Sequence, residues 1–155
     1  MLNTLKILLE KNNLTISVAE SCTGGNLQAL MTSESGASNF FEGGITCYNI
    51  DQKVKHLNVD RNIAEKCDCV SSDVAEQMAI GCNKLFNSNI SISTTGYITK
   101  HLFYSIAIND EIFLTEEIDL SNFNSRTNTQ KAACVDILFT LIKVLKNKYE
   151  PEHMI

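Results

Sequence analysis

The stretch Thr15-Ile16-Ser17-Val18-Ala19-Glu20-Ser21-Cys22-Thr23-Gly24-Gly25 decides how this chain folds. Its first half is apolar and β-branched, which predicts a strand over residues 14–19. Its second half holds an acid, two hydroxyls, a thiol and two glycines, and a helical segment follows. Backbone N–H groups at such a helix start favour negative charge, so Ser21 lies where an oxyanion could also be held. Ser21 and Thr23 could instead serve only to cap the helix.

The composition is that of one ordinary globular domain. The 155 residues are 44% hydrophobic and 20% charged, and we expect a single domain over residues 1–150 with a tail at 151–155. The net charge of -5 and the lack of a dense basic patch argue against nucleic acid as a partner. No apolar run reaches membrane-spanning length and no signal peptide is recognisable, so we expect a cytoplasmic protein without a membrane partner.

Cysteines and histidines give no metal-binding pattern. The six cysteines are expected to be reduced and mostly buried. The closest pair, Cys67-x-Cys69, has neither the spacing of a zinc knuckle nor a histidine nearby. The three histidines are scattered along the chain at His56, His101 and His153. We therefore expect no metal and no cofactor.

The pattern of apolar residues predicts an α/β fold. Helices are expected at 2–12, 24–33, 51–57, 60–66, 72–86 and over the C-terminal segment before Pro151, and strands at 14–19, 40–48, 90–95, 102–108 and 112–115. This order predicts a three-layer α/β/α sandwich around a central mixed sheet. The early strands should be parallel, and Asn109-Asp110 should turn the last two strands into an antiparallel hairpin.

Local signals refine these boundaries. Asp51 and Ser71 are expected to cap the helices that follow them, and residues 120–129 are polar and read as a loop. The apolar face of the helix after Ser71 is expected to consist of Val74, Met78, Cys82 and Leu85.

Ser21 needs a base to act as a nucleophile. Neither His56 nor His101 follows a strand end, so both are interpreted as surface residues. If the first two strands are parallel neighbours, Tyr48 and Lys53 project toward the Ser21 turn. A desolvated lysine can accept a proton, which a tyrosine hydroxyl could relay or orient. Alternatively, Tyr48 is an amphipathic strand-end residue and Lys53 a solvated helix residue.

The chain resembles the CinA C-terminal domain family, whose enzymatic members are nicotinamide-nucleotide amidohydrolases (NMN deamidases). The similar segments are Ala19-Glu20-Ser21-Cys22-Thr23-Gly24-Gly25, Gly36-Ala37-Ser38, Gly43-Gly44-Ile45-Thr46-Cys47-Tyr48-Asn49 with Lys53, Val70-Ser71, Val74-Ala75, Met78-Ala79-x-Gly81 and Thr95-Gly96. The resemblance implies an α/β/α sandwich with a hydrolytic Ser21 assisted by Tyr48 and Lys53. It also implies a stand-alone form that needs no cofactor or metal and that forms a homodimer.

The same resemblance suggests which residues meet a small nucleotide or amide substrate. These substrate-binding candidates are Glu20, Cys22, Thr23, Gly24, Gly25, Asn49, Thr95, Gly96 and Arg126. The backbone around Gly24 and Gly25 is expected to help stabilise the oxyanion.

The chain departs from the family after Gly96. Active members have a glycine-rich loop of the form G-x-x-G-P-x-G-G there, whereas this chain runs directly through Tyr97-Ile98-Thr99-Lys100-His101. A glycine-rich loop lets backbone amides approach a phosphate, so its loss removes one wall of the substrate pocket. A second family arginine, one turn after Arg126, corresponds here to Gln130.

Two interpretations of function stay open from the sequence. In the first, the chain is an amidohydrolase that converts nicotinamide mononucleotide to nicotinate mononucleotide and ammonia. In the second, it is a paralogue with little or no activity, repurposed for binding or for another amide because the nucleotide-binding loop is missing.

Overall fold

The computed structural model describes residues 1–122 and 125–153. The helices are α1 (Leu2–Lys11), α2 (Asn26–Thr32), α3 (Ile50–Leu57), α4 (Arg61–Lys66), α5 (Ser72–Phe86) and α6 (Arg126–Tyr149), with short 3-10 helices η1 (Ala37–Asn39) and η2 (Pro151–His153). The strands are β1 (Ile16–Glu20), β2 (Phe41–Thr46), β3 (Ile90–Tyr97), β4 (His101–Ile108) and β5 (Glu111–Asp119). The α-helices and strands follow each other in the order of the predicted segments, and the two 3-10 helices are additional to the prediction.

Five strands in the described ranges form one mixed sheet in the order β2-β1-β3-β4-β5. β1 pairs in parallel with both β2 and β3, while β4 pairs antiparallel with β3 and β5. β2 and β5 are the outer strands, and both of their pairings contain a bulge-like shift of register. All five residues of β1 are buried because this strand is covered on both faces.

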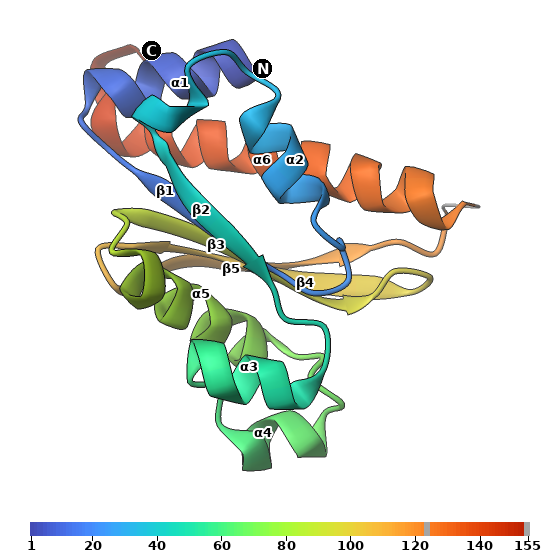
Figure 1. Ribbon diagram of the computed structural model, residues 1–155. Coiled ribbons are helices and arrows are strands. Elements are labelled where there is room, and N and C mark those ends of the chain that lie inside the picture. Colours follow the sequence, from blue (N-terminus) through green and yellow to red (C-terminus); the bar gives the residue numbers. More distant parts are fainter. Residues whose placement is uncertain (123–124, 154–155) are drawn as a thin grey trace.

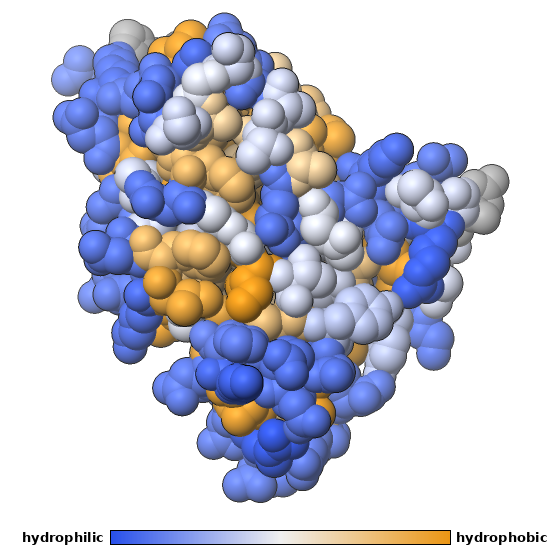
Figure 2. All heavy atoms as spheres, in the orientation of Figure 1, coloured by the Kyte–Doolittle hydropathy of each residue, from blue (hydrophilic) through white to orange (hydrophobic). Residues whose placement is uncertain are grey.

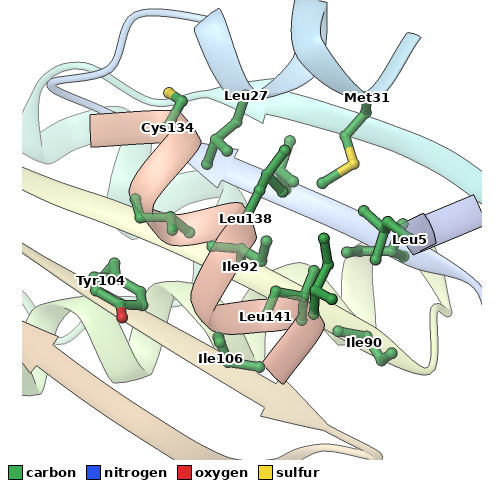
Figure 3. Close-up of a cluster of buried hydrophobic side chains, with 14 of the residues drawn as sticks. Leu5, Leu27, Met31, Ile90, Ile92, Tyr104, Ile106, Cys134, Leu138 and Leu141 are labelled. Carbon is green, nitrogen blue, oxygen red and sulfur yellow. The ribbon is translucent and has the colours of Figure 1, made fainter. Parts of the chain in front are cut away.

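Helices cover both faces of the sheet, so the predicted three-layer α/β/α sandwich is confirmed (Figure 1). α1, α2 and α6 lie on one face, where Leu5, Leu27, Met31 and Leu138 contribute to the larger apolar core (Figure 3). α3, α4 and α5 lie on the other face over a smaller core that includes Ala19 and Met78. Burial of these side chains is the main force that holds the three layers together.

Gly81 of α5 lets α3 pack closely on α5 and thereby positions the helix that carries Lys53. A Cβ atom on Gly81 of α5 would lie 2.1 Å from the backbone oxygen of Leu57 at the end of α3. α5 is in turn fixed to β3, because the hydroxyls of Ser91 and Ser93 donate to backbone oxygens of α5 at 2.6 and 2.5 Å.

Several local expectations are wrong. The first strand is Ile16–Glu20 and not 14–19, the second ends at Thr46 and not at 48, and the last runs over Glu111–Asp119 and not 112–115. Asn49, and not Asp51, caps α3: its side-chain oxygen accepts from the Gln52 N–H at 3.1 Å. Leu85 is 48% exposed, because it is the neighbouring Phe86 whose ring packs over Gly43 of β2. The Ser71 cap is confirmed, since the Ser71 hydroxyl accepts from the Val74 N–H.

The segment 120–129 is only partly a loop. Ser125 caps α6 through the Asn128 N–H at 3.3 Å, so residues 126–129 are helical, and residues 123–124 lie outside the described part. The hairpin at Asn109-Asp110 is confirmed, with positive φ at both residues. Of the expected tail at 151–155, Pro151–His153 form η2 and the last two residues are outside the description.

The surface around α3 and α4 is mostly hydrophilic (Figure 2). None of the helices in the described ranges is long and apolar enough to cross a membrane.

Candidate active site

Ser21 and Lys53 lie in direct contact at the carboxyl ends of β1 and β2. Ser21 follows the last residue of β1, and Lys53 lies in the first half of α3. The Lys53 Nζ atom is 2.8 Å from the Ser21 Oγ atom. Both residues are buried, with 6% of Ser21 and 1% of Lys53 exposed. The parallel pairing of β1 and β2 thus brings together the two residues that the sequence argument paired.

The Lys53 amine is surrounded by oxygen acceptors and not by carboxylates. Besides Ser21, Nζ contacts the backbone oxygens of Cys47 at 2.8 Å and Tyr48 at 3.0 Å. Among the described residues no carboxylate lies within ion-pair distance of it. Burial lowers the pKa of Lys53, and nearby cysteine thiolates and Asp68 would oppose this. A neutral amine can donate to the two carbonyls and offer its lone pair to the Ser21 hydroxyl.

Cys22, the neighbour of Ser21, stays a neutral thiol. Burial raises the pKa of the Cys22 thiol to about 12, and 3% of the residue is exposed. Because the thiolate is the reactive form of cysteine, Ser21 is the better nucleophile of the two.

Glu20 is held by hydrogen bonds inside the protein and is not among the residues that line the cavity beside Ser21. It is fully buried, and its carboxylate accepts from the N–H groups of Leu27 at 2.8 Å and Gln28 at 2.9 Å. It also accepts from the Thr23 hydroxyl at 2.7 Å. The negative charge that a helix start favours is therefore supplied to α2 by the protein itself.

Thr23, Gly24 and Gly25 shape the turn and also lie outside the cavity lining. The Thr23 hydroxyl is 2.8 Å from that of Thr94, which also accepts the Ser21 N–H at 3.2 Å. Gly24 and Gly25 have φ values of 62° and 96°, which glycine adopts without strain. The Gly24 N–H donates to the Ser21 carbonyl, so this N–H is not available to an oxyanion.

A cavity of about 620 Å³ opens over the Ser21–Lys53 pair. Its lining includes eight of the twelve predicted site residues, namely Ser21, Cys22, Tyr48, Asn49, Lys53, Thr95, Gly96 and Arg126. The four that it leaves out are Glu20, Thr23, Gly24 and Gly25. Asn49 reaches the cavity while capping α3.

Tyr48 meets the pair through its backbone and not through its hydroxyl. Its carbonyl accepts from Lys53, whereas its side chain is 62% exposed. The Tyr48 hydroxyl accepts a hydrogen bond from Arg126 Nη2 at 3.2 Å. In the described residues no hydrogen bond joins this hydroxyl to Ser21 or Lys53, so the expected proton relay is not present in this geometry.

Gln130 links α6 to the Ser21 turn. Its side-chain Nε2 donates to the backbone oxygen of Cys22 at 3.0 Å. The position that resembles a family arginine therefore supports the turn here by a neutral hydrogen bond.

The segment after Thr95 is a tight hairpin. β3 continues through Tyr97 and β4 begins at His101. Gly96 has a packing role here, since a Cβ atom on it would lie 2.4 Å from the Cα atom of Leu102. Ile98 is buried in the larger core, while Lys100 is exposed. The hairpin residues Tyr97, Ile98 and Thr99 line the same cavity as Ser21.

Sequence reasoning missed the wall that the segment 64–70 supplies. This wall includes Glu65, Asp68 and Cys69, and Thr95 is tied to it because its hydroxyl donates to the Cys69 carbonyl at 2.6 Å. The sequence offers the close pair Cys67-x-Cys69 in this segment, but no pattern that marks Glu65 or Asp68 as lining residues. In the described residues, no group of three His, Cys, Asp or Glu side chains could hold a metal.

Comparison with known families identifies the scaffold. The family model described as "CinA C-terminal domain" matches residues 1–99. The chain belongs to this family. The match ends in the turn between β3 and β4, where the sequence departs from the family pattern.

Curated relatives are named after CinA or competence. The chain is 47% identical over 91 residues to a CinA-like protein of Flavobacterium psychrophilum, a match that covers 59% of this chain and 22% of the relative. It is 30% identical to a CinA-like protein of Petrotoga mobilis, over 94% of this chain and 38% of the relative. It is 33% identical to a putative competence-damage inducible protein of Bacillus subtilis, over 96% of this chain and 37% of the relative. The chain therefore spans less than two fifths of these CinA relatives.

Solved structures of the CinA superfamily share the whole fold. A Klebsiella pneumoniae protein of this superfamily superposes with a TM-score of 0.88 at 19% identity, covering 94% of this chain and 96% of that protein. A competence/damage inducible protein of Agrobacterium tumefaciens superposes with a TM-score of 0.84 at 24% identity, covering 92% of this chain and 93% of that protein. The CinA fold is thus kept beyond residue 99.

Proposed function

We propose that this CinA-family domain hydrolyses a primary carboxamide, with Ser21 as the nucleophile and Lys53 as its general base. The observation that carries the proposal is the buried contact of 2.8 Å between Lys53 Nζ and Ser21 Oγ at the base of an open cavity. Burial lowers the pKa of the lysine, and a base with a lowered pKa can accept the serine proton near neutral pH.

The proposed reaction has two steps, acylation of Ser21 and hydrolysis of the acyl-enzyme. Ser21 Oγ attacks the carboxamide carbon as its proton moves to Lys53, and the C–N bond then breaks as Lys53 returns that proton to the departing amine, releasing ammonia. Water next attacks the acyl-enzyme as Lys53 takes one of its protons, and Ser21 leaves with that proton while the carboxylic acid departs. The backbone N–H of Cys22 donates to no other residue in the described part, which leaves it available to the oxyanion.

Nicotinamide mononucleotide is the first substrate to test. The resemblance to CinA-type amidohydrolases supports this choice, and hydrolysis would yield nicotinate mononucleotide within pyridine-nucleotide salvage. We place the substrate in the cavity with Asn49, Thr95 and Arg126 around it, all of which are lining residues. The homodimer expected for the family and the cytoplasmic location stay predictions.

A second candidate function is the hydrolysis of a different amide, or binding without turnover. The tight β3–β4 hairpin favours it, because Tyr97 and His101 pair directly across the strands where active relatives are expected to have a glycine-rich loop. Gln130 favours it as well, since a neutral amide stands where a second arginine is expected.

The test measures ammonia release from nicotinamide mononucleotide by the purified protein. Ser21→Ala and Lys53→Met should each lower the rate by at least about a hundredfold, the typical contribution of a nucleophile's base. Lys55→Met is the matched control, because Lys55 is an exposed lysine of the same helix. Release that persists in Ser21→Ala, or no release from any carboxamide at high protein concentration, would contradict the hydrolase proposal.

A further inference from the structure

The walls of the cavity carry opposite charges. Arg126 lies on one side, with its guanidinium on the Tyr48 hydroxyl. Glu65 and Asp68 lie on the wall made by segment 64–70. With Lys53 neutral, as its role as the base requires, the lining holds one cation and two carboxylates.

Asp68 is the less compensated of the two carboxylates. Glu65 has Arg61 at 3.8 Å, whereas no cation of the described residues lies within ion-pair distance of Asp68. Asp68 is therefore the carboxylate of this wall that is free to attract a positively charged ligand, and because it is exposed, salt screens this attraction.

The structure holds Asp68 in a defined position. Asp68 and Cys69 both have left-handed backbone, with φ of 51° and 62°, a conformation that non-glycine residues adopt at some energetic cost and often at functional sites. Tyr97, at the end of β3, donates its hydroxyl to Asp68 Oδ2 at 2.6 Å. The β3–β4 hairpin thus fixes this carboxylate through a hydrogen bond.

We infer that Asp68, positioned by Tyr97, selects carboxamides that carry a positive charge and no phosphate. This inference rests on the proposed amide hydrolysis. A phosphate dianion would find a single arginine in the lining, already bonded to Tyr48, and would be repelled by Asp68. A cationic amide meets attraction on the same wall. In a cavity of about 620 Å³, most of a ligand lies within one Debye length of Asp68, about 8 Å at physiological ionic strength.

The experiment compares nicotinamide riboside with nicotinamide mononucleotide, which differ only by the phosphate. The kcat/KM ratio of riboside to mononucleotide should exceed one for the unmodified protein. Asp68→Asn should lower this ratio by roughly fivefold at low salt, and the effect should shrink as salt is added. Asparagine tolerates left-handed backbone, so the variant should fold. Tyr97→Phe should change the ratio in the same direction by less.

Asp110→Asn is the matched control, because Asp110 is an exposed turn residue outside the cavity lining. Its ratio should equal that of the unmodified protein. Preference for the mononucleotide, or a ratio that Asp68→Asn leaves unchanged, would overturn the inference while the amidase proposal stands. No Ser21-dependent release from either compound would overturn both.

Discussion

Replacing Glu20 by glutamine tests whether this buried acid is structural or binds substrate. The carboxylate accepts three hydrogen bonds, from the N–H groups of Leu27 and Gln28 and from the Thr23 hydroxyl. A glutamine oxygen can keep the two partners of one carboxylate oxygen, but its NH₂ group then faces the N–H of Gln28. The change loses one charge-assisted hydrogen bond and leaves a buried donor unpaired. Together with the loss of negative charge at the α2 start, this should lower the free energy of unfolding by about 2–4 kcal/mol.

Equilibrium unfolding in urea, followed by circular dichroism, measures the effect of Glu20→Gln. Glu42→Gln is the control, because Glu42 is exposed on the outer strand β2, and it should change stability by less than about 0.5 kcal/mol. The substrate KM of the folded variant should stay unchanged. A raised KM with a stability loss below about 0.5 kcal/mol would refute the structural role of Glu20.

Three further predictions follow from the site and its support. The amidase rate should rise with pH and level off below 10.5, the ordinary lysine pKa, because burial lowers the pKa of Lys53; a flat pH–rate profile would contradict the assignment. As the pH falls from 10.5 to the lowered pKa, the unfolded chain binds this proton before the folded chain does, so the free energy of unfolding should decrease over that range. Gly81→Ala should lower the melting temperature despite alanine's better helix propensity, because its Cβ atom would lie 2.1 Å from the Leu57 backbone oxygen. An unchanged or raised melting temperature would show that α3 can move away from α5 at little energetic cost. Tyr48→Phe should reduce kcat/KM by less than about tenfold, since the Tyr48 hydroxyl contacts Arg126 and not Ser21. A loss as large as that of Ser21→Ala in the same assay would show that the hydroxyl does relay the proton.

Much of the fold could be predicted because its signals are local. The long C-terminal helix has a clear apolar period, and the Asn109-Asp110 turn has a backbone that few other residues adopt. The misplaced details depend on tertiary contacts. Leu85 has the spacing of a core residue, but the space beside Gly43 takes the ring of Phe86.

The candidate site could be predicted only in part. Ser21 and Lys53 could be paired because neighbouring parallel strands end on the same side of a sheet. The direction of the Tyr48 side chain could not, because it follows the end of β2 in irregular backbone. Asp68 was missed since its position depends on two left-handed residues and on a partner 29 positions away.

The two outer strands have a consequence for how the folded protein behaves at high concentration. Each has a shift of register in its pairing, which interrupts the row of free backbone groups that another chain could bind. β5 adds a row of carboxylates, from Glu111, Glu116, Glu117 and Asp119, which repel the same strand of a second copy. Near pH 5.1, the isoelectric point, the net charge of the molecule vanishes, so the long-range repulsion between copies is lost and only these local features protect the edges. Aggregation of the native state should therefore be strongest there.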